Sequence, residues 1–185
     1  VSQYYGARRY SQASAIAYHS IVLAFAAGIL FGIIGVVYAR TSLWLIGAKG
    51  QVLEYGVSYL QILLGGAVFL LVNFACNGIF RALGDAKTPL KIALFINVLN
   101  IFFSYVLIFG IWIVPAFGVQ GIAMGTIIAR GIGGMLALSI LHYPSRKVRL
   151  PFYMPLRKKY VQRILSIGLP SGFSGFFTFL NLDSL

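Results

Sequence analysis

Long apolar runs, separated by short polar segments, dominate this chain. Four of the runs are complete, and a fifth begins near Ile164 and continues to the last residue. A helix needs about 20 apolar residues to cross about 30 Å of hydrocarbon, because each residue advances it by about 1.5 Å. Each complete run reaches this length, so we predict four transmembrane helices, at residues 17–38, 55–80, 92–113 and 119–141. We expect the end of a further helix before Ser11.

The stretch 92–129 carries no charge and is too long for a single crossing. Pro115, Gly118 and Gly121 lie inside it, and such residues are typical of turns. We therefore predict a tight helical hairpin here. Three glycine pairs with four-residue spacing indicate that helices approach one another closely, at Gly28/Gly32, Gly121/Gly125 and Gly168/Gly172.

Composition supports a membrane protein. Hydrophobic residues make up 59% of the chain and charged residues 10%, and the mean hydropathy is +0.89. A net charge of +12 can indicate a nucleic-acid partner, but here the cations lie in clusters between apolar runs rather than on one solvated face. The fold class that follows is an all-α, polytopic transmembrane bundle, with membrane lipids as partners and no nucleic acid.

The distribution of the cations predicts the orientation, because cytoplasmic loops hold the excess of Lys and Arg. Twelve of the fifteen fall on one alternating set of segments, against Arg40 and Lys49 on the other. We predict that the basic set is cytoplasmic: Arg8, Arg9, Arg81, Lys87, Lys91, Arg146, Lys147, Arg149, Arg157, Lys158, Lys159 and Arg163. Residues 142–163 form the longest loop, and we predict that they link a helical lobe at 1–141 to a second lobe that begins at 164–185.

Polar residues inside two predicted spans are candidates for a transport pathway, because polar groups in a membrane usually face the bundle interior or a wet cavity. Asn97, Asn100 and Ser104 fall on one stripe of their helix, and Thr126 and Arg130 are four residues apart on the next. An arginine facing lipid would cost at least about 2.5 kcal/mol, so we expect Arg130 to point inward. Both groups can equally serve to hold helices together.

The chain has few residues of the types that carry out catalysis. The chain holds two histidines, one cysteine and three acids, Glu54, Asp85 and Asp183, spread along the sequence. A nucleophile with a base, a metal set or a pair of carboxylates at one depth is therefore not indicated, and neither is a phosphate-binding loop. We expect no enzyme, no cofactor and no metal site.

The chain contains four motifs: Val1-Ser2-Gln3 with Gly6-Ala7, the loop 81–89 (RALGDAKTP), the run from Asn100 through 107–110 (LIFG) to 118–126 (GVQGIAMGT), and Gly168-Leu169-Pro170. In this order and spacing they together resemble the multidrug and toxic compound extrusion (MATE) family. In the loop, Gly84 suits a tight turn, Asp85 can cap the next helix or pair with Arg81, and Pro89 suits a first helical turn. We read this loop as a rigid cytoplasmic elbow.

The resemblance implies twelve helices in two lobes, of which this chain would hold the end of the second helix to the start of the seventh, cut at both ends. It implies export of small organic, often cationic, compounds in exchange for Na⁺ or H⁺, by a monomer in the plasma or inner membrane. Asn100 and Thr126 match two positions that some members use for coupling, and Ser104 stands where some carry an aspartate. Thr178 replaces the glutamate through which other members couple.

Aromatic side chains in the spans are expected either to contact flat cationic substrates or to face lipid: Phe102, Phe103, Tyr105, Phe173, Phe176 and Phe177. Two other functions stay open. A flippase for lipid-linked sugars shares the two-lobe fold but usually lines its cavity with several cations, and Arg130 alone is available here. The second of these other functions is a membrane scaffold without transport activity.

Overall fold

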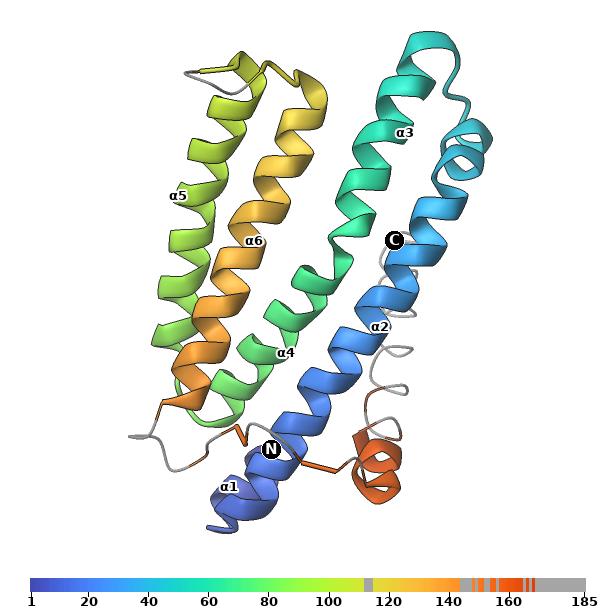
Figure 1. The fold of residues 1–185 in the computed structure, drawn as a ribbon. Coiled ribbons are helices and arrows are strands. Elements are labelled where there is room, and N and C mark those ends of the chain that lie inside the picture. Colours follow the sequence, from blue (N-terminus) through green and yellow to red (C-terminus); the bar gives the residue numbers. More distant parts are fainter. Residues whose placement is uncertain are drawn as a thin grey trace, which may run out of the picture.

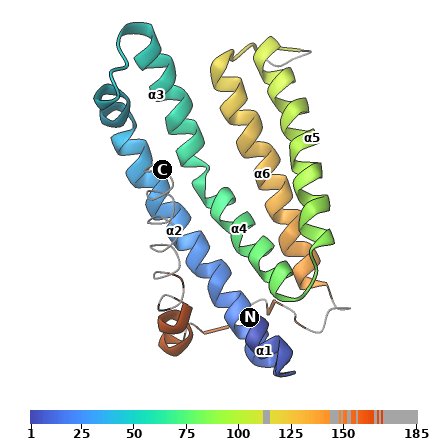
Figure 2. The same cartoon turned by 180° about the vertical axis from the view of Figure 1, so that it is seen from behind.

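The fold is a bundle of long helices (Figures 1 and 2). The computed structural model describes residues 1–111, 115–143, 148, 150–151, 154–155, 157–164, 166 and 168. Within them the helices are α1 (Ser2–Gly6), α2 (Tyr10–Leu45), α3 (Gly50–Gly65), α4 (Ala67–Ala82), α5 (Lys87–Phe109) and α6 (Val119–His142), and these residues include no strand. The predicted all-α class is confirmed.

Among the described residues, three helices are long and apolar enough to cross a membrane, namely α2, α5 and α6, and α3 with α4 make a fourth if they count as one span. The predicted runs at 17–38 and 119–141 lie in α2 and α6, and the run at 92–113 corresponds to α5, which begins earlier, at Lys87, and ends at Phe109. Helix α2 is longer than predicted, because it continues without a break from Tyr10 to Leu45. Its last residues are polar or exposed, so the apolar run alone did not mark where it ends.

The second predicted span, 55–80, is wrong as a single straight helix. Helix α3 ends at Gly65, α4 begins at Ala67, and the two axes differ by 45°. Two glycines together weaken a helix, since they lack side chains to restrict the backbone. The break is also where α2 comes closest: a Cβ placed on Gly28 would lie 2.5 Å from the Cα of Val68, and one on Gly32 would lie 3.0 Å from the Leu64 carbonyl oxygen.

The predicted hairpin between α5 and α6 is present. Gly110 ends α5 in the left-handed conformation, with φ of 68°, and Gly118 precedes α6 with φ of 54°. Gly121 was assigned to the turn, but it lies inside α6. A Cβ there would lie 2.7 Å from the Leu107 carbonyl, so this glycine serves helix contact rather than the turn. The Gly28/Gly32 and Gly121/Gly125 pairs both mark close approaches, whereas Gly172 of the third pair lies outside the described residues.

The elbow between α4 and α5 has the predicted geometry. Gly84 is left-handed, with φ of 80°. The Asp85 carboxylate accepts hydrogen bonds from the Thr88 amide at 2.9 Å and from the Thr88 hydroxyl at 2.6 Å, and Pro89 stands in the first turn of α5. Asp85 thus caps the helix, which was one of the two roles predicted for it.

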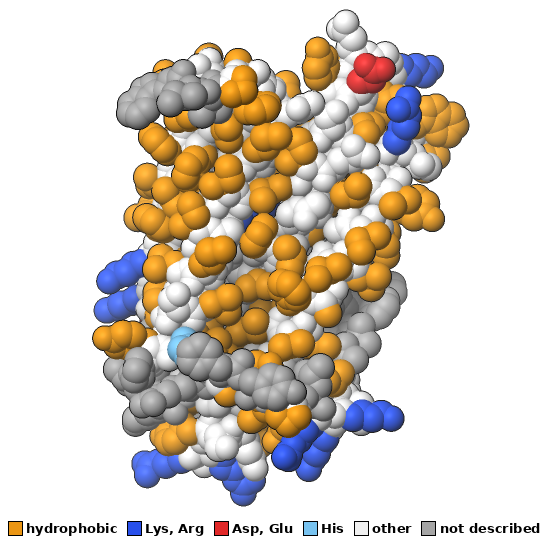
Figure 3. Space-filling model, viewed as in Figure 1, with side chains coloured by type: hydrophobic (Ala, Val, Ile, Leu, Met, Phe, Trp, Pro, Cys, Tyr) orange, Lys and Arg blue, Asp and Glu red, His pale blue; other side chains and the backbone are white. Residues whose placement is uncertain are grey.

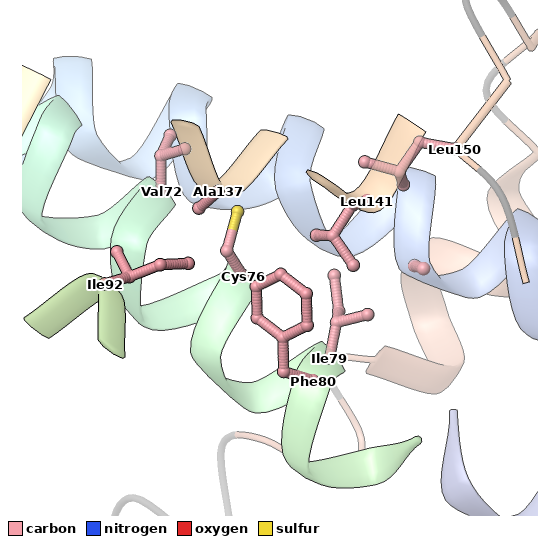
Figure 4. Close-up of a cluster of buried hydrophobic side chains, with 9 residues drawn as sticks. Val72, Cys76, Ile79, Phe80, Ile92, Ala137, Leu141 and Leu150 are labelled. Atoms are coloured by element: carbon pink, nitrogen blue, oxygen red, sulfur yellow. The ribbon is translucent and has the colours of Figure 1, made fainter. Parts of the chain in front are cut away.

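A cluster of buried apolar side chains lies where α4, α5 and α6 meet near the elbow (Figure 4). Phe80 and Leu141 are its largest fully buried members, with Cys76 beside them. Leu150, which follows α6, also belongs to it. The cluster therefore anchors the segment after α6 to the end of the bundle.

Apolar side chains cover the outer faces of the helices (Figure 3). Among the most exposed are Ile101 at 71%, Leu94 at 67% and Val37 at 66%. Lys and Arg gather mainly at the end that holds α1, the α4–α5 elbow and the segment 157–164, and a smaller charged group lies at the opposite end, near the α2–α3 connection (Figures 1 and 3). Such a surface, apolar in the middle and charged at its ends, is typical of a bundle that spans lipid.

Candidate functional site

The clearest polar contact between two spans joins α5 to α6. The Asn100 side-chain amide donates a hydrogen bond of 2.8 Å to the Thr126 hydroxyl, and this hydroxyl in turn donates to the Ile122 carbonyl at 2.9 Å. Both side chains were predicted pathway residues. The structure brings these two together, 26 residues apart in sequence.

Ser104, one turn beyond Asn100 on α5, faces the same neighbour. Its hydroxyl is buried and has no hydrogen-bond partner in the part of the chain that the structure describes. A Cβ placed on Gly125 would lie 2.6 Å from the Ser104 amide nitrogen, so the two backbones are nearly in contact here. Asn97, by contrast, is exposed. The predicted stripe is therefore divided, with two members at the α5–α6 contact and the third on the outer surface.

Two asparagines of α4, Asn73 and Asn77, were not recognised in the sequence. Asn73 is 7% exposed, and its amide donates to the Phe69 carbonyl at 2.8 Å and to the Arg130 carbonyl at 2.9 Å. Its own carbonyl oxygen, like that of Asn77, is buried and has no partner among the described residues. The spacing of four residues within an apolar run was the available signal, because it places both amides on one face.

Arg130 lies midway along α6 and is half-buried. Thr126, which contacts α5, and Gly134, which contacts Asn73 of α4, are each four residues away, so each is rotated from Arg130 by about 40°. Arg130 therefore lies on the side of α6 between its contacts with α5 and α4. The inward direction of its side chain and its role in a pathway stay predictions. No ion pair to its guanidinium is found within the described ranges.

The predicted aromatic positions on α5 lie mostly on its outer side. Phe102 and Tyr105 are 58% and 57% exposed. Phe102 packs edge-on against Phe103, with ring centroids 5.5 Å apart, and Tyr105 packs against Phe109 at 5.0 Å. Thr178, Phe173, Phe176 and Phe177 fall outside the described residues, and their roles stay predictions.

Groups that hold metals were searched for as well. In the described part of the chain, no three His, Cys, Asp or Glu side chains come together. The oxygens that converge at the α5–α6 contact are neutral amide and hydroxyl oxygens. Such oxygens can accept hydrogen bonds from a polar substrate or contact a hard cation, since hard cations prefer oxygen ligands.

Comparison with known proteins gives a consistent picture. The family model MatE matches residues 1–106. The probable multidrug resistance protein YoeA of Bacillus subtilis is 28% identical over 177 residues, which cover 92% of this chain and 38% of that protein. The chain thus spans less than half the length of the curated relatives that it matches.

Solved structures agree with the sequence matches. An inward-facing multidrug resistance MATE family transporter of the MOP superfamily superimposes with a TM-score of 0.81 at 27% identity, over 92% of this chain and 38% of that one. A MOP superfamily transporter from Pyrococcus furiosus, described as having a binding pocket of reversed polarity, gives 0.82 at 27% identity, over 94% and 38%. The shared fold is that of transporters rather than of enzymes, and the helices are those of a multi-pass membrane protein. On the family match, the ordered motifs and the common fold, this chain belongs to the MATE family of multidrug transporters.

Proposed function

We propose that the protein to which this chain belongs exports drugs or other small organic compounds across the cell membrane in exchange for Na⁺ or H⁺. The chain supplies the amino-terminal lobe, residues 1–141, of a monomeric transporter with two lobes. Residues 142–163 link it to the second lobe, and the basic end of the bundle faces the cytoplasm. Family membership supports this proposal, and so does the multidrug function in the names of the relatives.

The observation that carries the proposal is the contact between Asn100 and Thr126. Asn100 uses an N–H group in this bond, so its carbonyl oxygen stays available to a cation or a substrate. The unpartnered Ser104 hydroxyl lies one turn away. None of these three side chains changes its charge near neutral pH. They therefore suit an ion-binding or substrate-binding role, and a proton carrier would have to come from another part of the protein.

Alternating access follows if cation and substrate favour different states of the transporter. A ligand shifts such an equilibrium only by the difference between its affinities for the two states. A cation held by oxygens at the α5–α6 contact and a substrate bound between the lobes would favour different states, while α5 and α6 themselves stay together. Competition for one cavity then couples cation entry to substrate exit.

The test replaces both contact residues in the full-length protein, with Asn100→Ala and Thr126→Ala. We expect ion-driven ethidium efflux from vesicles to fall by about tenfold or more, because hydrogen bonds to charged groups are worth about 1.5–3 kcal/mol and 1.4 kcal/mol is tenfold in binding. Ser139→Ala is the matched control, since this serine of α6 is exposed and its hydroxyl donates to the Met135 carbonyl of its own helix. Unchanged efflux in the double variant would remove the proposed site.

Arg130 favours a second candidate, a flippase or exporter for anionic substrates. This arginine lies in the middle of α6, between the contacts of that helix with Asn73 and with Asn100. In addition, a related transporter is described as having a binding pocket of reversed polarity. An anionic headgroup would supply the missing counter-charge. Arg130→Gln should then abolish transport of an anionic lipid-linked sugar while Arg130→Lys retains part of it. Ethidium efflux that survives Arg130→Gln, without any sugar transport in the parent, rejects this candidate.

A further inference from the structure

We propose that His19 is a pH-operated clasp, which holds the segment after α6 against the amino-terminal lobe while neutral and releases it when protonated. This inference concerns regulation and is independent of which compound is transported. It rests on contacts that join α2 to residues 150–163, the segment proposed to link the two lobes.

The His19 ring is completely buried, at 0% exposure. Its Nε2 lies 3.0 Å from the backbone nitrogen of Arg157, and its Nδ1 lies 2.7 Å from the Ala15 carbonyl oxygen. The Arg157 amide can only donate, so Nε2 must accept and carry no hydrogen. The hydrogen of the neutral ring is then on Nδ1, where it is donated to Ala15. Both ring nitrogens are satisfied in one protonation state alone.

Aromatic side chains enclose the ring on both sides of this contact. Tyr160 packs against it with centroids 5.1 Å apart, and Tyr18 packs edge-on at 5.8 Å. Within the described residues, the titratable or charged residues with a recorded contact to the ring are these two tyrosines and Arg157, and no carboxylate there pairs with it. A positive charge on the ring would therefore be buried without a counter-ion, which is costly.

Two further contacts hold the same segment, and neither depends on a group that titrates near neutral pH. The Leu150 amide donates to the Leu141 carbonyl at 3.3 Å, and Leu150 is buried in the apolar cluster. Arg163 donates to the Tyr4 hydroxyl at 2.6 Å and lies 5.2 Å from the centre of that ring. The segment is thus attached at three places, of which the middle one is sensitive to pH.

Protonation of Nε2 would turn an acceptor into a donor that faces the donor of Arg157. The hydrogen bond is then lost, and the two N–H groups repel each other. The contact therefore exists when the ring is neutral and is lost when both ring nitrogens carry a hydrogen, and protonation of histidine is a common pH switch in proteins. Since His19 lies at the basic end of the bundle, the pH concerned is that of the cytoplasm under the proposed orientation.

Hydrogen exchange in the full-length protein tests the clasp directly. At pH 8, we expect the Arg157 amide to be protected, and at pH 5 we expect its protection factor, corrected for intrinsic exchange, to fall at least tenfold. His19→Gln keeps an acceptor but cannot titrate, so protection should be equal at the two pH values. His142→Gln, which changes the other histidine of this chain, should behave like the parent.

Two results would overturn the proposal: equal protection at pH 5 and pH 8 in the parent protein, or an unchanged pH dependence in His19→Gln. A measurement on the unaltered protein covers the case in which the variant does not fold. In nitrogen NMR of histidine-labelled protein at pH 8, the His19 Nε2 should give the signal of a nitrogen without hydrogen. A hydrogen on Nε2 at that pH would contradict the clasp, whatever the transport activity.

Discussion

Helix α6 has two contact faces that are built differently. Toward α5 it presents Gly121 and Gly125, and Cβ atoms placed there would meet backbone atoms of Leu107 and Ser104. Toward α3 and α4 the contacts are made by side chains: Ile127 packs over Gly66, Phe69 lies by Gly131, and Asn73 lies by Gly134. At Gly121 and Gly125 the α5 face is limited by backbone, which cannot move aside, although Gly133 of the same face meets the Ile96 side chain. The α3–α4 contacts are limited by side chains, which can move.

This difference predicts which pair of helices moves as a unit. Two backbones in contact, joined also by the Asn100–Thr126 bond, make α5 and α6 a stiff hairpin. The contact with α4 spans a break at residues 65–66 and relies on side chains that have more than one rotamer. If the lobe changes shape during transport, we expect the change between α6 and the α3–α4 pair, and not between α5 and α6.

The largest effect is expected from Gly125→Ala. The new methyl group would lie 2.6 Å from the Ser104 amide nitrogen, so the helices must separate, at a cost of about 3 kcal/mol. Thermal unfolding of the full-length protein in detergent measures the loss. Gly78→Ala is the control, because a Cβ there meets nothing within 4 Å, and alanine favours a helix over glycine by up to about 1 kcal/mol. Equal melting temperatures for the two variants would show that the α5–α6 contact is not tight.

A smaller effect is expected from Gly66→Ala. The Cβ would lie 2.5 Å from a side-chain carbon of Ile127, and φ of −87° suits alanine, so the cost should be about 1 kcal/mol. The second substitution Ile127→Ala should relieve the clash and recover most of the difference in a double-mutant cycle. The equivalent pair Gly125→Ala with Ser104→Ala should recover little, since the backbone remains in the way. Equal recovery in the two cycles would remove the distinction between the faces.

The smallest effect is expected from Asn73→Ala, which removes the bond to the Arg130 carbonyl. Hydrogen bonds between transmembrane helices are worth about 0.6 kcal/mol on average, because the carbonyl keeps a helical partner. The same unfolding measurement, with Ser139→Ala as control, checks this value. A loss as large as that of Gly125→Ala would mean that the polar contact, and not close packing, dominates the stability of the bundle.

Local patterns predicted much of the fold. Apolar length located the spans, Pro115 and Gly118 located the hairpin, and Gly84 with Asp85 located the elbow, because each depends on residues close in sequence. The break at residues 65–66 was missed. The run from 55 to 80 is mostly apolar and long enough for one crossing, and the Gly65–Gly66 pair inside it was not recognised as a break. The close approach of Gly28 and Gly32 of α2 to this point joins residues that are distant in sequence.

In the candidate site, too, the sequence pointed to individual residues but not to their partners on other helices. Spacing within the helices and the family resemblance selected Asn100 and Thr126 as candidate pathway residues but did not predict that they contact each other. Asn73 bonds to a carbonyl 57 residues away, and His19 to an amide 138 residues away. Partners of this kind depend on how helices are placed in space, and no periodicity in one sequence carries that information.

The uninterrupted length of α2 has a mechanical consequence. With 36 residues at about 1.5 Å each, it measures about 54 Å, well beyond the roughly 30 Å of a hydrocarbon core. A rod of that length acts as a lever: a tilt of about 10° around its midpoint displaces each tip by about 5 Å. His19 lies about 13 Å from that midpoint, so the same tilt would displace the segment attached to His19 by about 2 Å, less than half of the displacement at the tip.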